Sequence, residues 1–220
     1  MIEIGSARDA YRAFVEDVGP RLRLALISAF GPDMGAKATA DALVWGWEHW
    51  ERLAAMDTPA AQLYQVGERK IPRMRRPQLP APLVSAQSIR PALPRALERL
   101  TAQQRALVLL MHGYGWTRRD ASDTLGINRS LARRYLDQAL ADLREELDPG
   151  LDVDLLPQIR AYASELDEAA APFEELRPRL PVLVEARRPA GPSGRWALAI
   201  TAVVIVLGVV AAVALMLEFQ

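Results

Sequence analysis

The chain has 220 residues, of which 50% are apolar, and its 27 lysine and arginine residues balance 27 aspartate and glutamate residues. Overall charge therefore predicts no partner, and any polyanion must be bound by a local basic patch. The absence of cysteine excludes disulfides and thiolate metal sites and is compatible with a reducing cytoplasm.

The first third of the chain is expected to form helices, without a convincing strand. Ser6 and Thr58 are candidate N-caps, Pro20 and Pro59 suit first helical turns, and Gly31 begins a Gly-Pro-Asp stop. These signals predict four helices, over residues 7–18, 20–30, 35–56 and 59–70.

Three tryptophans stand within six residues of the third predicted helix, at Trp45, Trp47 and Trp50. Trp45 and Trp47 would point to different sides of a helix, so one core stripe cannot use all three. We expect one of them to face a partner.

Prolines divide the chain into segments. Six of them between residues 72 and 94 mark an extended linker. The predicted division is a helical domain over 1–76, a proline-rich linker over 77–92, a second helical domain over 93–147, an acidic, proline-containing spacer over 148–195 and an apolar helix over 196–217. The expected fold is all-α, with two small helical domains and one transmembrane helix.

The second domain contains a helix-turn-helix pattern between Thr117 and Leu143. Ser122, Gly126 and Ala132 place small residues where two crossing helices approach and a glycine where the turn needs left-handed backbone. Asn128 is a candidate N-cap for the second helix. The residues expected to face a DNA groove are Arg118, Arg119, Arg129, Ser130, Leu131, Arg133 and Arg134. The alternative is a helical hairpin with a solvated basic face.

Charge is distributed unevenly along the chain. A second basic cluster lies between Arg69 and Arg76, so a polyanion could be bound at two points. Residues 148–175 are mainly acidic, and the stretch over 147–189 suggests one or two short amphipathic helices. This stretch could mask a basic face, contact an accessory protein or act as a spacer, and its prolines favour the spacer.

The apolar run over 196–217 contains no charged residue. As a helix it would span roughly 33 Å, enough for a hydrocarbon core of about 30 Å. Arg187, Arg188 and Arg195 precede it, which predicts a single span of the inner membrane with the N-terminus in the cytoplasm.

Patterns typical of enzymes are absent from the sequence. His49 and His112 have no spacing to other ligands that would hold a metal, and no glycine-rich phosphate loop is present. We therefore expect no catalytic residue, no metal and no cofactor.

The soluble part resembles a bacterial sigma factor of the extracytoplasmic-function class, the promoter-recognising subunit of RNA polymerase. Residues 97–147 are similar to region 4 of that family, in which Thr117 with Asp120 opens the motif and Ala139-Leu140 lies near its end. The resemblance implies that this domain reads the −35 promoter element in duplex form. Ala121 and Ala132 stand where the family usually has larger apolar residues.

The first domain is more loosely similar to region 2, which binds the polymerase β′ clamp and reads the −10 element. The resemblance implies clamp contacts by Asp41, Leu43, Trp45, Trp47 and Trp50, and −10 recognition and melting by Tyr64, Arg69, Lys70 and Arg73. An anti-sigma or accessory membrane protein is a further implied partner. Ala40 replaces the usual acidic residue before Asp41, and the Gln-Glu pair that normally follows is missing.

Three hypotheses follow. The chain is a membrane-tethered sigma factor, a membrane-anchored helix-turn-helix regulator that is not a polymerase subunit, or an interaction protein of sigma-like fold that sequesters a partner. A four-helix bundle with tryptophan in its core is the plainer interpretation of the first domain.

Overall fold

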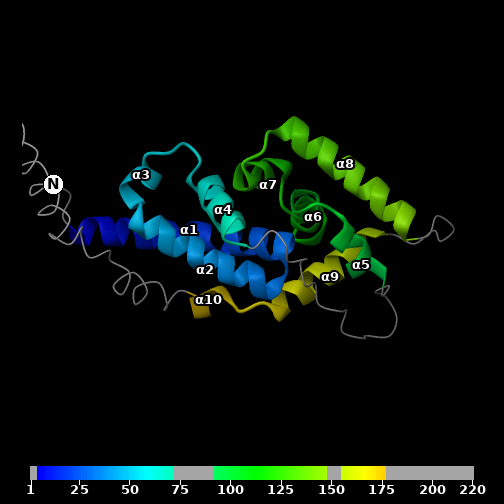
Figure 1. The fold of residues 1–220 in the computed structure, drawn as a ribbon, viewed down its shortest axis with the longest axis horizontal. Coiled ribbons are helices and arrows are strands. Elements are labelled where there is room, and N and C mark those ends of the chain that lie inside the picture. The colour runs from blue at the N-terminus through cyan, green and yellow to red at the C-terminus, as the bar shows by residue number, and fades with distance from the viewer. Residues whose placement is uncertain (1–3, 72–91, 148–154, 177–220) are drawn as a thin grey trace, which may run out of the picture. The chain divides into compact units, whose positions relative to one another are not determined.

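The computed structural model describes residues 4–71, 92–147 and 155–176, and every element within these ranges is helical (Figure 1). The elements are α1 (Ile4–Phe30), α2 (Pro32–Glu48), α3 (Trp50–Ala54), α4 (Pro59–Lys70), α5 (Ala92–Arg99), α6 (Ala102–Val108), the π-helical turn η1 (Leu109–Gly113), α7 (Arg118–Leu125), α8 (Arg129–Glu146), α9 (Leu155–Ala169) and α10 (Phe173–Leu176).

The two helices predicted over 7–18 and 20–30 are one continuous helix, α1, so this prediction was wrong. Pro20 lies inside it and is exposed. A proline inside a helix leaves the carbonyl four residues earlier without its partner, but on an exposed face water can take that place. The predicted stop at Gly31 is confirmed, because Gly31 has a φ of 86° between α1 and α2.

The predicted helix over 35–56 is divided at His49. This residue leaves helical geometry, with φ −124° and ψ 24°, and separates α2 from the short α3. The predicted helix over 59–70 is confirmed as α4, with Pro59 in its first turn.

α1 and α2 pack side by side, and α4 packs on both (Figure 1). The close approach of α1 and α2 depends on Gly35, where an added Cβ would lie 2.5 Å from the Cα of Ile27. The centre of this group is apolar, with Leu22, Leu26 and Leu43 fully buried.

The second half of the chain continues the same core. Leu107 of α6 and Tyr162 of α9 belong to one buried cluster with Leu22 and Tyr64. The guanidinium of Arg105, on α6, donates to the carbonyl of Ala29 at the end of α1 with an Nε–O distance of 3.0 Å. The helices of the predicted domains 1–76 and 93–147 therefore share one interior.

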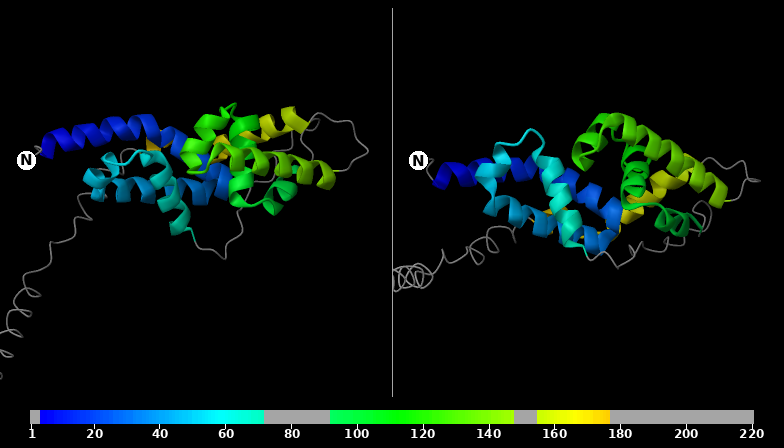
Figure 2. Two further views of the ribbon diagram at one scale, coloured as in Figure 1. Left: turned by 90° about the horizontal axis from the view of Figure 1, so that it is seen from above. Right: turned by 45° about the horizontal axis from the view of Figure 1, so that its top comes forward.

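Part of the segment predicted as a spacer is folded. Residues 155–169 form α9, which packs against η1, α1 and α2, and α10 packs against α1 (Figure 2). The prolines of this stretch do not prevent packing, because Pro157 lies in the first turn of α9 and Pro172 lies between α9 and α10. Proline in the first turn of a helix or between two helices costs little helix stability, so the apolar stripe of α9 can still be buried.

Several predictions concern residues outside the described ranges: the linker over 77–92, Arg73, and the apolar helix over 196–217. Within the described ranges no helix is both long and apolar enough to cross a membrane.

Candidate nucleic-acid interface

The predicted helix-turn-helix is confirmed in its local geometry. Gly126, between α7 and α8, has φ 68° and ψ 32°, a left-handed conformation that glycine adopts without steric cost. The side-chain oxygen of Asn128 accepts a hydrogen bond from the backbone N–H of Leu131 at 2.7 Å and so caps α8.

The first helix of the motif has a cap of its own. The hydroxyl of Thr117 accepts from the backbone N–H of Asp120 at 3.1 Å and donates to the Asp120 carboxylate at 2.6 Å. The second of these bonds lowers the pKa of Asp120, as does Arg21 of α1, 3.2 Å away.

Small residues occupy the crossing of the two helices, as predicted. Ser122 is 1% exposed and Ala132 is fully buried. The Ser122 hydroxyl donates to the carbonyl of Arg118 at 2.6 Å, so this buried polar group is satisfied.

The residues predicted to face a groove lie on the solvent side of α7 and of the first turns of α8. Leu131 is half-buried, and the others are exposed: Arg118, Arg119, Arg129, Ser130, Arg133 and Arg134. α8 packs mainly against α5, α6 and α7, and it lies on the outer side of this group (Figures 1 and 2). The basic face is therefore accessible to a large ligand.

The charge of this face is only weakly compensated. Arg119 is 3.7 Å from Asp123 and Arg133 is 3.6 Å from Asp137, both exposed pairs of the kind that contribute little. Within the described residues Arg118, Arg129 and Arg134 have no ion pair. The positive end of the α8 dipole lies at the same place. Guanidinium groups so placed can bind phosphates or guanine edges.

Ser130 differs from the arginines because its hydroxyl is engaged. It donates to the side-chain oxygen of Asn128 at 2.8 Å, so it supports the cap of α8 in this state.

Of the residues assigned to −10 recognition, Tyr64 does not lie at the surface. Tyr64 is fully buried on the apolar side of α4, and no hydrogen-bond partner for its hydroxyl lies within the described chain. Burial is the main cause that raises the pKa of its phenol, and Glu68 adds to it. In this conformation Tyr64 is a core residue and cannot stack on a base. Arg69 and Lys70 are exposed at the end of α4.

The residues assigned to polymerase binding have mixed positions. Leu43 is fully buried in the core, so in this conformation it offers no surface to a partner. Asp41 is ion-paired with Lys37 at 2.7 Å on the same helix. Trp45 is half-buried and stacks on His49, with 4.3 Å between ring centroids.

Trp47 and Trp50 belong to an aromatic cluster at the junction of α1, α2 and α3. The ring of Tyr11 lies 5.4 Å from Trp47 and 5.1 Å from Trp50, and Phe14 lies 5.2 Å from Trp50. Both tryptophans keep part of their surface exposed. They are thus mainly packing residues with an accessible edge.

Two arginines are buried although their burial was not predicted from sequence. Arg23 is 6% exposed and Arg105 is 2% exposed, and each donates to several main-chain carbonyls. Nothing in their neighbourhood marks either one as buried, except that each lies among apolar residues of a helix. Arginine is an uncommon choice at such positions unless it is paired.

Comparison with known proteins agrees with the helix-turn-helix. Residues 90–143 match the family model described as Sigma-70, region 4. Among solved structures, the chain is similar to the sigma factor RpoE, crystallised in complex with the anti-sigma factor NepR from Bartonella quintana. The two chains share 19% identity, over 63% of this chain and 96% of that chain, with a TM-score of 0.44. A search of the curated proteins gave no match.

The matched range begins just before α5 and ends within α8. It contains α7, most of α8 and the exposed arginines of these two helices at positions 118, 119, 129, 133 and 134. Residues 90–143 therefore form a sigma-70 region 4 domain.

Proposed function

We propose that the chain is a sigma factor that directs RNA polymerase to promoters, with α7 and α8 reading the −35 element. The observation that carries this proposal is the region 4 match over residues 90–143, together with exposed arginines at the groove-facing positions of that domain. Such domains hold their second helix in the major groove, where arginine can make bidentate bonds to guanine.

The N-terminal helices have the second role in this proposal. They would bind the polymerase β′ clamp through the exposed edges of Trp45, Trp47 and Trp50, and recognise the −10 element from the basic end of α4, at Arg69 and Lys70. The predicted anti-sigma or accessory membrane partner stays a prediction.

The experiment is transcription in vitro with core RNA polymerase, the detergent-solubilised full chain and genomic DNA fragments. Specific transcripts are expected only when the chain is added. We expect Arg134→Ala to weaken promoter binding by about 1–3 kcal/mol if Arg134 reads a base, with relaxed preference at one position. If Arg134 contacts a phosphate, binding weakens at every sequence and the salt dependence becomes shallower.

A matched control is available on the same helix. Arg144 is exposed near the other end of α8, about 15 Å along the axis, so Arg144→Ala removes the same charge away from the groove-facing turns. Equal effects of the two substitutions would contradict the assigned orientation of α8. If the chain binds DNA but neither co-purifies with core polymerase nor supports transcription, it is instead a helix-turn-helix regulator.

We also propose that residues 196–217 hold the protein in the inner membrane as a single span, with its N-terminus in the cytoplasm. The support is the uncharged run itself and the arginines that precede it. We expect the full chain to remain in the membrane fraction after alkaline carbonate extraction. The variant with Ile205→Arg and Val209→Arg is expected in the supernatant, because each central arginine costs about 2.5–3.5 kcal/mol. Extraction of the unaltered chain would refute the tether.

A further inference from the structure

The segment from α9 to α10 (residues 155–176), here the α9–α10 segment, connects two parts of the fold that are distant in sequence. One side of α9 is fully buried, at Ile159, Tyr162, Ala163 and Leu166. α9 packs against η1, which leads into the helix-turn-helix, and against α1 and α2 of the N-terminal group. It therefore ties the region 4 domain to the N-terminal helices.

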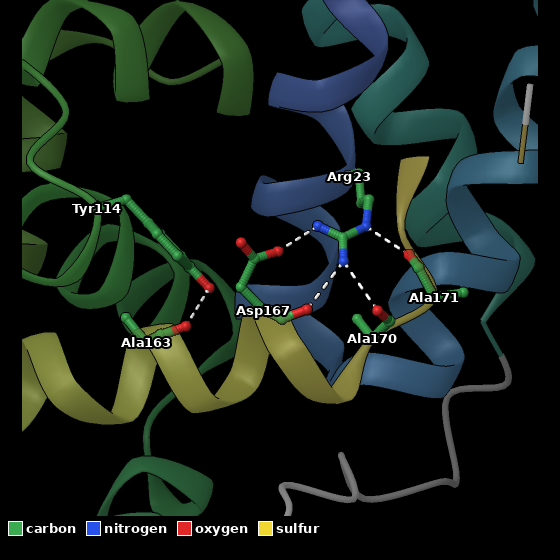
Figure 3. Close-up of polar contacts among 6 residues, drawn as sticks. All are labelled: Arg23, Tyr114, Ala163, Asp167, Ala170 and Ala171. Carbon is green, nitrogen blue, oxygen red and sulfur yellow. Dashed lines mark hydrogen bonds and ion pairs between the residues drawn. The ribbon is translucent and has the colours of Figure 1, made fainter. Parts of the chain in front are cut away.

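Arg23 of α1 fixes the C-terminal end of α9 (Figure 3). Its Nε donates to the carbonyl of Ala171 at 2.7 Å, and one terminal nitrogen donates to the carbonyls of Asp167 and Ala170 at 3.0 and 3.1 Å. The other terminal nitrogen binds the Asp167 carboxylate. A buried cation thus satisfies the unpaired carbonyls of the helix end, where the helix dipole is negative.

Two glycines give the α9–α10 segment room to approach. A Cβ on Gly113 of η1 would lie 2.4 Å from the Cβ of Ala163, and a Cβ on Gly19 of α1 would lie 2.2 Å from the ring of Phe173. Tyr114 adds a hydrogen bond from its hydroxyl to the carbonyl of Ala163 at 2.8 Å (Figure 3). A side chain at Gly113 would displace α9, and one at Gly19 would have to move the ring of Phe173, so both glycines favour the close approach of the segment.

The same closed arrangement covers α4. Helix α7 packs against α4, and a Cβ on Gly126 at the motif's turn would lie 3.2 Å from both the Cβ of Ala61 and the side-chain nitrogen of Gln65. Tyr64, on the buried side of α4, is inaccessible. The part of α4 that carries Ala61 and Gln65 is thus covered by the turn of the motif, and an unstacked base strand cannot approach it there.

We propose that the α9–α10 segment is an intramolecular lock: it holds the helix-turn-helix against α1 and α4 and keeps the −10 recognition helix closed until the segment is released. The inference rests on the proposed function. α4 and α7 both pack on α1, where α6 and the Arg105–Ala29 hydrogen bond also hold the second half of the chain. α9 adds a further tie from η1 to α1, so release of α9 removes one of the contacts that keep the helix-turn-helix on α4. The segment lies C-terminal to the region 4 domain and outside the family match.

The test uses an engineered disulfide in the full chain, which has no natural cysteine. Ala61→Cys combined with Gly126→Cys places two thiols across the α4–α7 contact, where the Cβ separation of 3.2 Å must widen slightly to suit a disulfide, about 3.5–4.5 Å. The cysteine at position 126 takes a left-handed backbone with φ 68°, and the reduced double variant carries the same strain, so the comparison of its oxidised and reduced forms is matched. The rate of disulfide formation reports how often the contact is closed. Oxidation is expected to abolish transcription with core polymerase, and dithiothreitol is expected to restore it.

The lock is then weakened by Ala163→Glu, which puts a charge into the contact with Gly113. Ser164→Glu is the matched control, because Ser164 is the next residue of α9 and is exposed. We expect Ala163→Glu to slow disulfide formation by about tenfold and to raise transcription by the uncross-linked chain several-fold, since one lost core contact shifts a two-state equilibrium by this order. Phe173→Ala, at the other end of the segment, is also expected to slow disulfide formation and to raise transcription. Agreement between the two variants would show that the effect does not come from a folding defect in one of them.

Each other outcome is decisive. Disulfide formation at an unchanged rate in both lock variants overturns the inference, as does slower formation with unchanged transcription. A third outcome separates the two proposals. If the disulfide forms more slowly in the lock variants but no variant, nor the unaltered chain, supports transcription, the proposed function is refuted and the closing role of the segment is supported.

Discussion

Replacing Arg105 by methionine is expected to lower the free energy of unfolding by about 3–5 kcal/mol. The guanidinium of Arg105 is 2% exposed and donates to the carbonyls of Ala29, Leu97 and Leu100 at 3.0, 3.0 and 3.2 Å. Methionine fills a similar volume without a donor, so carbonyls at the ends of α1 and α5 lose their partners inside the protein.

The measurement is urea denaturation at neutral pH, followed by circular dichroism. Arg99→Met is the matched control, because Arg99 is an exposed arginine of α5 whose partner is Glu146, and exposed pairs contribute at most about 1 kcal/mol. Arg105→Lys is expected to lie between the two, since lysine keeps the charge but not the planar set of donors. Equal losses from Arg105→Met and Arg99→Met would show that Arg105 does not join α1 to α5 and α6.

Alkaline pH is expected to unfold the chain steeply above pH 10. Burial raises the pKa of Tyr11, Tyr64, Tyr114 and Tyr162. Above a pH of about 10 the unfolded chain releases these phenol protons while the folded chain retains them, so ionisation favours unfolding, by about 1.4 kcal/mol per pH unit for each tyrosine. The stability that these tyrosines contribute is complete below their unfolded pKa and is lost as the pH rises.

Arg105 opposes this trend. Burial lowers the pKa of Arg105 to about 10, and the charge of Glu98 opposes this, so loss of a proton from the folded chain in this range makes the net slope shallower than the sum over the four tyrosines. Urea denaturation at pH 9, 10 and 11 measures it.

Tyr64→Phe isolates one contribution to this slope. The Tyr64 hydroxyl has no partner within the described chain, so its removal is expected to cost nothing at neutral pH and to make the alkaline slope shallower by one tyrosine. An unchanged slope would show that Tyr64 ionises as freely in the folded protein as in the unfolded one.

The helix-turn-helix could be predicted from sequence because its determinants are local. Gly126 supplies a left-handed turn and Asn128 supplies a cap, and both act within a few residues of their own positions. Ser122 and Ala132 have a fixed spacing from that turn, so their burial follows from the geometry of two crossing helices. Exposure of the arginines follows in turn, because they occupy the opposite face.

The positions of Tyr64 and Leu43 could not be predicted in the same way. α4 is amphipathic in sequence, but whether its apolar stripe meets DNA, polymerase or another helix depends on α1 and α7, which are distant along the chain. The burial of α9 has the same origin. The prolines of this stretch favour a spacer, whereas the packing of α9 depends on Gly113 and that of α10 on Gly19, and both glycines show their role only when a Cβ is placed on them.

The contacts of Arg23 affect the order in which the protein can fold during synthesis. Its partners at Asp167 and Ala171 follow it by 144 and 148 positions, so most of the polypeptide must leave the ribosome before this arginine is satisfied. Contacts of such long range slow folding. The helix-turn-helix, whose caps and turn are local, can form earlier on the nascent chain, and for that interval it exists without α9 packed beside it on η1.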